Sequence, residues 1–266
     1  MNACKFFIAA AFLVATGFLI SCEVNDSTVN DTGRLTVQLT DAPGNYEAVY
    51  VDIQKVRIIR ADAEATDDSA NWITLNDEPV RVDLLQLRNG KTMQLGEHEL
   101  QAGMYNQIRL VLGNDNDVIV NGDSYALDTP SAQQSGLKLN INANIKEGEH
   151  YNLLIDFDAA RSIIETGNGN FILKPGLRAV NLEETGSIGG TVQPSDFETT
   201  VMAIAGDDTL SSITTSDGYF NIAGVKEGTY NVELRPNSST YSDTTIANVS
   251  VPFNEDVDLG KINLKQ

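Results

Sequence analysis

From residue 34 onward, hydrophobic and polar positions alternate with a period of two, which is the pattern of β-strands with one buried face. In "RLTVQLT" (34–40), for example, Leu35, Val37 and Leu39 fall on the same face. Glycine- and asparagine-rich turn sequences such as "RNGK" and "NGDS" separate the predicted strands. The pattern predicts an all-β protein built as a sandwich or barrel. Further strands are predicted at 48–60, 107–112, 117–121, 137–142, 151–157 and 177–182.

No apolar pattern of period 3.6 is long enough for a large helix. The best short candidate is "DAARSIIE" (158–165), in which Asp158 is placed to cap the first turn. Helices therefore contribute little to the predicted fold.

The composition changes at "NLEETGSIGG" (181–190), and a shorter run of strand-like segments follows it. We therefore predict two consecutive β-sandwich or barrel domains, at 34–184 and 186–266, with a boundary near Thr185. The second domain is short enough for a seven-stranded sandwich, and its Asp217-Gly218 pair predicts a hairpin turn.

The N-terminus has the pattern of an export signal. Lys5 precedes fifteen uncharged residues, Phe6 to Ile20, fewer than the roughly 20 that a membrane-spanning helix needs. The sequence "LISC", ending at Cys22, resembles the lipobox of bacterial lipoproteins. The resemblance implies a signal peptide at 1–21, acylation of Cys22, and a polar tether at 22–33 that leads into the first domain.

Two alternatives exist for this segment: Cys22 is an ordinary free cysteine, or the apolar run is an uncleaved anchor. Only Cys4 and Cys22 are present, and Cys4 lies in the predicted signal peptide. The mature chain would have no disulfide although it is exported, and lipidation explains its single remaining thiol. We therefore expect a lipid-anchored protein, most simply of the outer membrane, facing the periplasm or the cell surface.

The chain carries 18 basic and 37 acidic residues, a net charge of −19. Nucleic-acid binding needs clustered Lys and Arg to meet phosphates, so this class of partner is excluded. Acidity also fits cation binding, which makes the aspartates worth considering individually.

A glycine shortly before a tyrosine opens several predicted strands, as at Gly103/Tyr105 and Gly228/Tyr230. We interpret this as a hairpin device, in which the tyrosine ring covers the end of a sandwich and its hydroxyl finds a backbone partner. A row of sugar-binding aromatic platforms is the alternative. The same spacing occurs at Gly44/Tyr46 and Gly148/Tyr151.

The second domain resembles the carboxypeptidase regulatory-like family through "GSIGGTV" (186–192), "TTSDGYFNIAGVKEGTYNVEL" (214–234) and "VDLGKINL" (257–264). The resemblance implies a transthyretin-like, carbohydrate-binding-like fold and says little about function.

The first domain resembles a bacterial domain of unknown function, DUF family 4382. The matching segments include "LTVQLTDAPGNYEAVYVDIQKVRI" (35–58), "AGMYNQIRLVL" (102–112), "LLIDFDAARSI" (153–163) and "FILKPGLRAV" (171–180). The resemblance implies a secreted or lipid-anchored protein of a Bacteroidetes-like envelope, and it implies no established activity.

The sequence contains no catalytic motif that we can identify. Its two histidines, His98 and His150, lie beside acidic residues and turns, as exposed histidines do. No G-x-S-x-G elbow, Cys-His pair or H-E-x-x-H motif is present. We therefore expect a protein that is not an enzyme.

Asp156 and Asp158 fall on one face of a predicted strand, opposite Ile155 and Phe157. We interpret them first as structural, because Asp158 is placed to cap a turn and Arg161 lies within reach of a carboxylate. A cation site is the second interpretation, and a glycosidase pair is the third.

Three further aspartates are candidate Ca²⁺ ligands: Asp41 at the end of a strand, and Asp115 and Asp117 in "GNDNDVIVNGD". Turn formation is the simpler explanation for each, because the segment lacks the spacing of an EF-hand loop. No other metal or cofactor is indicated.

Trp72, the single tryptophan, opens a predicted strand after an acidic loop. A core position is the first interpretation and a sugar-stacking platform is the second.

These observations support a non-enzymatic, lipid-anchored envelope protein, whose first domain binds a ligand or partner and whose second is a spacer or docking module. The alternative is a carbohydrate-binding accessory lipoprotein of a glycan-uptake system. A glycosidase using Asp156 and Asp158 is a lesser alternative. The expected partners are the membrane, through the lipid anchor, and a carbohydrate or another envelope protein.

Overall fold

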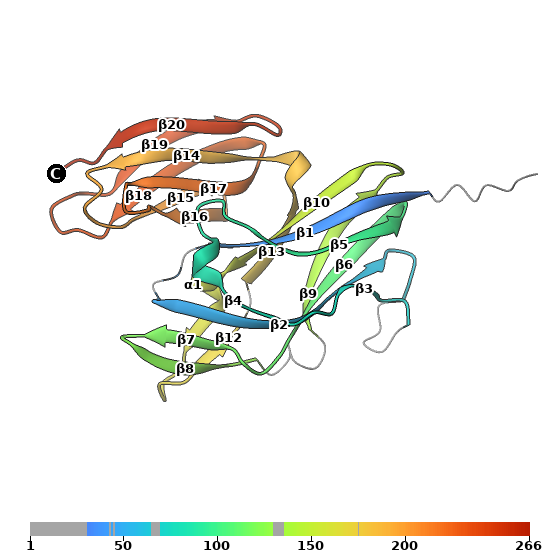
Figure 1. The fold of residues 1–266 in the computed structure, drawn as a ribbon. Coiled ribbons are helices and arrows are strands. Elements are labelled where there is room, and N and C mark those ends of the chain that lie inside the picture. Colours follow the sequence, from blue (N-terminus) through green and yellow to red (C-terminus); the bar gives the residue numbers. More distant parts are fainter. Residues whose placement is uncertain (1–30, 43, 45, 65–69, 130–135, 175) are drawn as a thin grey trace, which may run out of the picture. The chain divides into compact units, whose positions relative to one another are not determined.

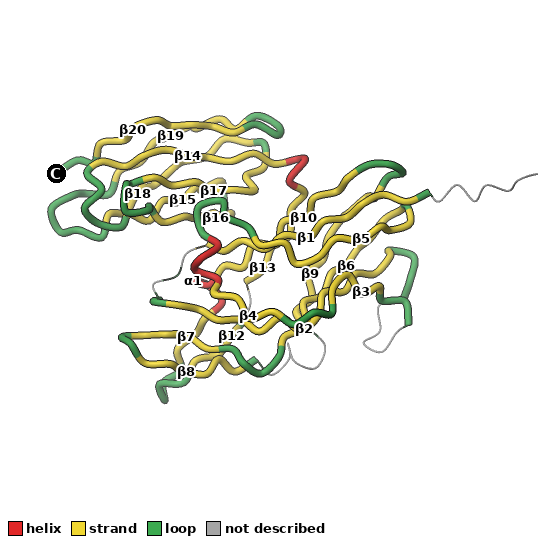
Figure 2. Tube along the Cα trace, viewed as in Figure 1, coloured by secondary structure: helices red, strands yellow, loops and turns green. Residues whose placement is uncertain are grey.

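The computed structural model describes residues 31–42, 44, 46–64, 70–129, 136–174 and 176–266. Asp31–Gln266 forms one compact unit, built almost entirely of β-strands in four sheets that make two consecutive sandwiches (Figures 1 and 2). The predicted all-β fold is therefore confirmed. The predicted signal peptide and Cys22 lie outside the described residues.

The first sandwich contains a four-stranded and a nine-stranded sheet. The four-stranded sheet has the order β13 (Gly176–Asn181), β10 (His150–Asp158), β1 (Thr32–Ala42) and β5 (Met93–Gln101). The nine-stranded sheet has the order β11 (Ile163–Glu165), β12 (Phe171–Leu173), β8 (Asp123–Asp128), β7 (Asp117–Val120), β2 (Ala48–Arg60), β6 (Gly103–Leu112) and β9 (Leu137–Ile145). Two short strands, β3 (Ile73–Asn76) and β4 (Val80–Asp83), also pair with β2, and the 3-10 turn η1 (Leu84–Leu87) follows β4.

Strand parity decides which side chains form the first core. Leu35, Val37 and Leu39 of β1 have no exposed surface, as their alternation predicts. The parallel neighbour β10 adds Ile155 and Phe157 to the same hydrophobic cluster. The residues between them, including Asp156, therefore point to the opposite face of this sheet.

Two predicted boundaries are corrected by strand pairing. β1 begins at Thr32, inside the predicted tether, because Thr32 pairs with Gln101 and Gly33 with Leu100 of β5. The helix α1 spans only Ala159–Ser162, because Ile163 already begins β11, paired with Leu173. Tertiary pairing overrides the local pattern at both places.

The second sandwich contains a three-stranded and a four-stranded sheet. The 3-10 turn η2 (Leu182–Glu184) leads into it. Its first sheet has the order β17 (Tyr219–Lys226), β14 (Thr185–Gln193) and β20 (Asp256–Asn263). Its second has the order β16 (Asp208–Ile213), β15 (Thr199–Ala205), β18 (Gly228–Pro236) and β19 (Thr244–Val251). Phe220, Ile222 and Val232 lie in a separate hydrophobic cluster between these sheets.

The predicted hairpin at Asp217-Gly218 is wrong in topology. The turn itself forms, with the Gly218 N–H donating to the Thr215 carbonyl at 2.9 Å and a φ of +84° at Gly218. It joins β16 to β17, however, and these strands belong to different sheets. The Asp-Gly pair predicts a turn from neighbouring residues alone. Which strands pair is decided by contacts between residues that are far apart in the sequence.

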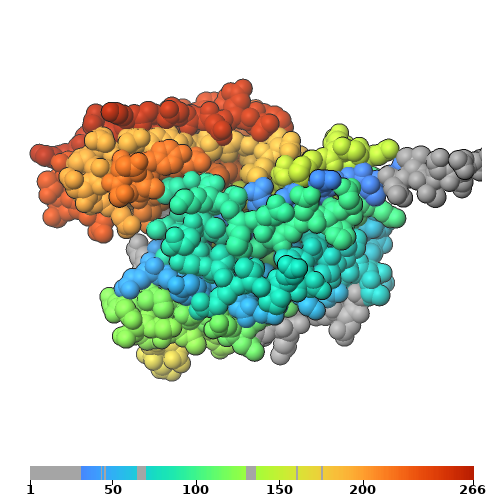
Figure 3. Space-filling model, viewed as in Figure 1, coloured from blue at the N-terminus to red at the C-terminus, as the bar shows by residue number. Residues whose placement is uncertain are grey.

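Among the described residues, no helix has the length and apolar character that would let it cross a membrane. The two sandwiches lie against each other (Figure 3). Hydrogen bonds from Arg178 of the four-stranded sheet and from Ser212 to Asn89 join them.

Candidate functional site

The junction of the two sandwiches is built on the face of β10 that points away from the first core. Leu154, Asp156 and Asp158 share this face by parity. This face packs against β17 of the second sandwich. Gly224 of β17 approaches it so closely that a Cβ atom added there would lie 3.3 Å from Leu154 Cδ2 and 3.1 Å from Val180 Cγ2. Gly224 has a φ of +68°, so both the space and the backbone favour glycine at this approach.

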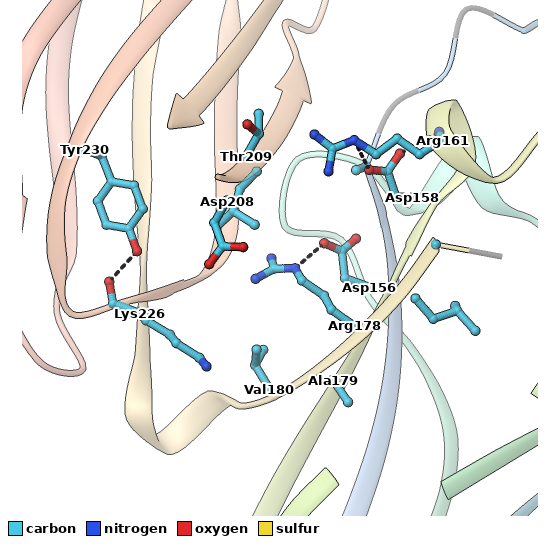
Figure 4. A pocket seen from close by; sticks show the side chains of 14 residues that line it. Asp156, Asp158, Arg161, Arg178, Ala179, Val180, Asp208, Thr209, Lys226 and Tyr230 are labelled. Atoms are coloured by element: carbon cyan, nitrogen blue, oxygen red, sulfur yellow. Dashed lines mark hydrogen bonds and ion pairs between the residues drawn. The ribbon is translucent and has the colours of Figure 1, made fainter. Parts of the chain in front are cut away.

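Asp156 holds an arginine that connects the two sandwiches. Arg178 Nε donates to Asp156 Oδ2 at 2.8 Å, and the two residues are cross-strand partners in β13 and β10. The other guanidinium nitrogens donate to carbonyls of the second sandwich, Nη1 to Gly224 at 3.0 Å and Nη2 to Ala223 at 3.2 Å. Asp156 therefore orients Arg178, and Arg178 satisfies carbonyls at the open edge of β17 (Figure 4).

Asp158 caps α1, as predicted. Its Oδ1 accepts from the Arg161 backbone N–H at 3.0 Å, and its Oδ2 pairs with Arg161 Nε at 3.4 Å. Burial raises the pKa of the Asp158 carboxyl, and the Arg161 N–H partly offsets this effect. Both members of the candidate carboxylate pair therefore have partners within the fold.

Asp41 lies at the end of β1 and is only 5% exposed. Its Oδ1 accepts from the Ala159 N–H at 3.0 Å, a long-range contact in place of the predicted local turn bond. Its Oδ2 is buried without a hydrogen-bond partner. Burial raises the pKa of the Asp41 carboxyl well above its ordinary value, and the nearby Asp156 and Asp158 add to the effect.

A second connection between the sandwiches comes from the turn after η1, which no sequence pattern marks as a contact between domains. Asn89 has a φ of +59°, and its Oδ1 accepts from Ser212 Oγ at 2.6 Å and from the Asn221 N–H at 3.3 Å. Beside it, a Cβ on Gly90 would lie 2.5 Å from Asn221 Nδ2. The "RNGK" turn signal located this loop, but nothing in it indicated a partner in another domain.

A groove of about 410 Å³ runs along this junction and is lined by both sandwiches. Leu177 and Leu210 contribute apolar surface. Tyr230 adds its ring, and Arg161, Asp208 and Lys226 contribute charges (Figure 4). A second cavity of about 540 Å³ shares Asp158, Arg161 and Thr209 with the first, so the groove continues between the outer face of β15 and β16 and the first sandwich. The groove is concave and combines apolar surface with several charged side chains.

Asp115 and Asp117 lie apart from this groove and have a different partner. Both carboxylates form ion pairs with Arg81, Asp115 at 3.1 Å, and Asp117 also accepts from Ser124 Oγ at 2.9 Å. The structure therefore does not unite the candidate Ca²⁺ ligands in one place. In the part of the chain that is described, no group of three His, Cys, Asp or Glu side chains is arranged to hold a metal ion.

Trp72 is 5% exposed, which leaves too little indole surface for a sugar to stack on. The guanidinium of the buried Arg109 lies 4.0 Å from the ring centroid, and that of Arg57 lies 5.9 Å from it. The structure therefore favours the core interpretation of this residue. His98 and His150 are exposed, and His150 Nε2 lies 2.7 Å from Thr36 Oγ1.

The fold and the site define an all-β protein with two sandwiches joined by a polar junction and no identified reaction centre among the described residues. The model of the family described as "Domain of unknown function (DUF4382)" matches residues 32–175, more than half of the chain. The chain therefore belongs to the DUF4382 family. No curated protein matches it.

Solved structures similar to this chain include a type II cohesin–X-dockerin complex from Acetivibrio cellulolyticus, with 26% identity over 30% of this chain and 56% of that one and a TM-score of 0.25. The Bacillus anthracis TIE protein is 11% identical over 88% of this chain and 34% of its own, with a TM-score of 0.22. The shaft pilin SpaA from Lactobacillus rhamnosus GG is 12% identical over 86% and 97%, with a TM-score of 0.22. The chain thus spans little more than half of the first of these structures, and none of them carries an argument about function.

Proposed function

We propose that this protein is a non-enzymatic, lipid-anchored protein of the cell envelope that binds a partner in the groove between its two sandwiches. The DUF4382 sandwich is the interaction module, and the second, a carboxypeptidase regulatory-like module, docks against it. The observation that carries the proposal is a groove of about 410 Å³ lined by residues of both sandwiches.

We propose a protein that is not an enzyme because both candidate acids already have partners within the fold. Asp156 is paired with Arg178, and Asp158 caps α1 and pairs with Arg161. A glycosidase needs two carboxyl groups that both reach the substrate. The glycosidase alternative therefore has little support in this geometry.

Photo-cross-linking tests the groove directly. A benzophenone amino acid at Thr209, which lines both cavities of the groove, should give a discrete cross-linked product in whole cells. The same amino acid at Ser250, an exposed residue of β19, is the matched control. Equal labelling from both positions, or none from Thr209, would contradict the proposed binding surface.

The anchor and the outer-membrane location rest on "LISC" and its preceding apolar run. Cys22→Ala should release the protein from the membrane fraction, because acyl chains supply the membrane affinity. Cys4→Ala is the matched control and should stay membrane-bound. If Cys22→Ala fractionates with the membrane like the wild type, the anchor is not a lipidated Cys22.

A carbohydrate ligand is the second candidate function, favoured by a different cavity of about 610 Å³ that is lined by β8, β12 and the turn before β12. The half-buried Tyr125 lines it, and the exposed Asp128 and Asn170 lie beside this ring. Phe171 is buried behind Tyr125, with ring centroids 5.1 Å apart, and supports the Tyr125 ring from the core. On a glycan array, Tyr125→Ala should lose binding while Tyr219→Ala, at an exposed tyrosine outside this cavity, keeps it. Background signal from the wild type on every polysaccharide would eliminate this candidate.

A further inference from the structure

The strand β1 connects the N-terminal side of the chain to the groove (Figure 1). Its first residue, Thr32, follows the segment that leads from the proposed anchor at Cys22. Its last residue, Ala42, lines the groove together with Asp156 and Asp158, at the end of the neighbouring strand β10. One strand therefore has the anchor side at one end and the proposed binding surface at the other.

β1 is held by hydrogen-bonded strands on both sides. Its residues 34–42 pair in parallel with 150–158 of β10, as nine consecutive pairs without a register shift. On its other side, residues 32–39 pair with 93–101 of β5. The parallel ladder extends over about 26 Å, at about 3.3 Å per residue.

The direction of a force on β1 decides how these two ladders respond. Tension along the strand axis acts on all of their hydrogen bonds at once, whereas tension across one end of a ladder breaks the pairs one after another. Because unfolding under force is governed by the unfolding rate, the first kind of loading should leave the fold intact for much longer.

Burial of the β1 side chains opposes sliding of the strand. Leu35, Val37 and Leu39 have no exposed surface. Because side chains alternate between the two faces of a strand, a slide of one residue would move this apolar row to the opposite, polar face. β1 can therefore leave its place only after both ladders have broken.

Two side chains at the groove end of β1 add bonds to other elements. Thr40 Oγ1 donates to the Leu87 carbonyl at 2.9 Å and to the Lys91 carbonyl at 3.1 Å. Asp41 Oδ1 accepts from the Ala159 N–H at 3.0 Å, at the start of α1. The end of β1 beside the groove is therefore connected to η1, the turn after it and α1, as well as to β10.

We propose that β1 is a load-bearing strand, which transmits tension between the lipid anchor at its N-terminal end and a partner held in the groove at its C-terminal end. This inference rests on the proposed function and adds a mechanical role to it. A partner pulled away from the membrane loads β10 and α1 at the groove, while the tether holds β1 at its start. The two ladders are then sheared along the strand axis.

Single-molecule force spectroscopy on the chain from Cys22 to Gln266 tests the proposal. One handle is attached to the Cys22 thiol, and the second to a cysteine introduced by Arg161→Cys, at a side chain that is 60% exposed and lines the groove. The matched control is Glu147→Cys, in the exposed turn before β10 at the opposite end of the ladder. Under the same constant force, the folded state should survive about tenfold longer or more with the Arg161→Cys handle, because only this pair of handles loads the ladders along their length.

Thr40→Val removes the two side-chain bonds at the groove end of β1 and keeps the shape of the side chain. We expect it to shorten the lifetime about fivefold with the Arg161→Cys handle. With the Glu147→Cys handle it should have no effect, because the first pair to break, Arg34–His150, lies at the other end of the ladder.

Equal lifetimes in the two geometries, or a longer lifetime with the Glu147→Cys handle, would overturn the load-bearing role. If Cys22→Ala is nevertheless released from the membrane, the anchor stands without that role. A membrane-bound Cys22→Ala would instead overturn the anchor, whatever the two lifetimes are, so the mechanical role and the proposed function fail separately.

Discussion

Asp41 carries a buried carboxylate oxygen without a hydrogen-bond partner, and burial raises the pKa of its carboxyl. The folded protein therefore binds this proton more tightly than the unfolded chain does. The resulting stabilisation is fully present below the unfolded-state pKa and is lost as pH rises through the folded-state pKa. Above that point, the fold contains a buried and only partly satisfied charge.

Asp41→Asn keeps an oxygen that accepts from the Ala159 N–H and removes the charge. We expect the variant to be more stable than the wild type at pH 8, by about 1–3 kcal/mol, and to lose this advantage at pH 4. Thermal unfolding followed by circular dichroism at both pH values measures the difference. Asp115→Asn, at an exposed carboxylate, is the control, and a pH-independent effect of Asp41→Asn would refute the titration argument.

At the scale of elements, the recurrent Gly–Tyr spacing is a structural device in two places. Tyr105 OH donates to the Gln101 carbonyl and Tyr230 OH to the Lys226 carbonyl, each at 3.0 Å and four residues upstream. The hydroxyl therefore ties the start of β6 or β18 to the strand before it. The prediction of a backbone partner is confirmed at both positions.

Removing these hydroxyls should destabilise the protein without changing its fold. Tyr105→Phe and Tyr230→Phe keep the rings, and each should lower the free energy of unfolding by about 0.5–1.5 kcal/mol. Urea unfolding followed by fluorescence measures this change. Tyr219→Phe, at a tyrosine that is 43% exposed, should be neutral, and an equal loss there would show that the upstream carbonyls are not the cause.

Strand parity is the part of the fold that the sequence predicts best. The alternation in β1 identified its buried face correctly, and the same alternation in β10 placed Asp156 and Asp158 together on the face that points away from the core. It could not show that this other side faces a second sandwich, because pairing across domains leaves no periodic signal. For the same reason Arg178 and Asn89 were missed as contacts, although each lies in a recognised strand or turn.

At the scale of the whole molecule, the junction depends on an ion pair of the first sandwich whose arginine also donates hydrogen bonds to the second sandwich. Asp156 and Arg178 have side chains that are 10% and 30% exposed, and Arg178 also donates to Gly224 and Ala223. Arg178→Ala would leave the Asp156 carboxylate nearly buried without its cation and would free both carbonyls. Loss of one partner from a buried pair costs about 3–5 kcal/mol, and the partial exposure of Arg178 reduces that cost.

We expect Arg178→Ala to separate the melting of the two sandwiches, so that calorimetry shows two transitions where the wild type shows one. Arg161→Ala, at an arginine whose side chain is 60% exposed, should leave a single transition. Adding Asp156→Asn to Arg178→Ala should recover part of the stability, because the uncompensated charge is removed, but it should not restore the bonds to Gly224 and Ala223. A single transition in Arg178→Ala would mean that Asn89 and the apolar contacts hold the junction alone. Two transitions in that variant, together with loss of the cross-linked product from Thr209, would show that the groove requires the docked arrangement of both sandwiches.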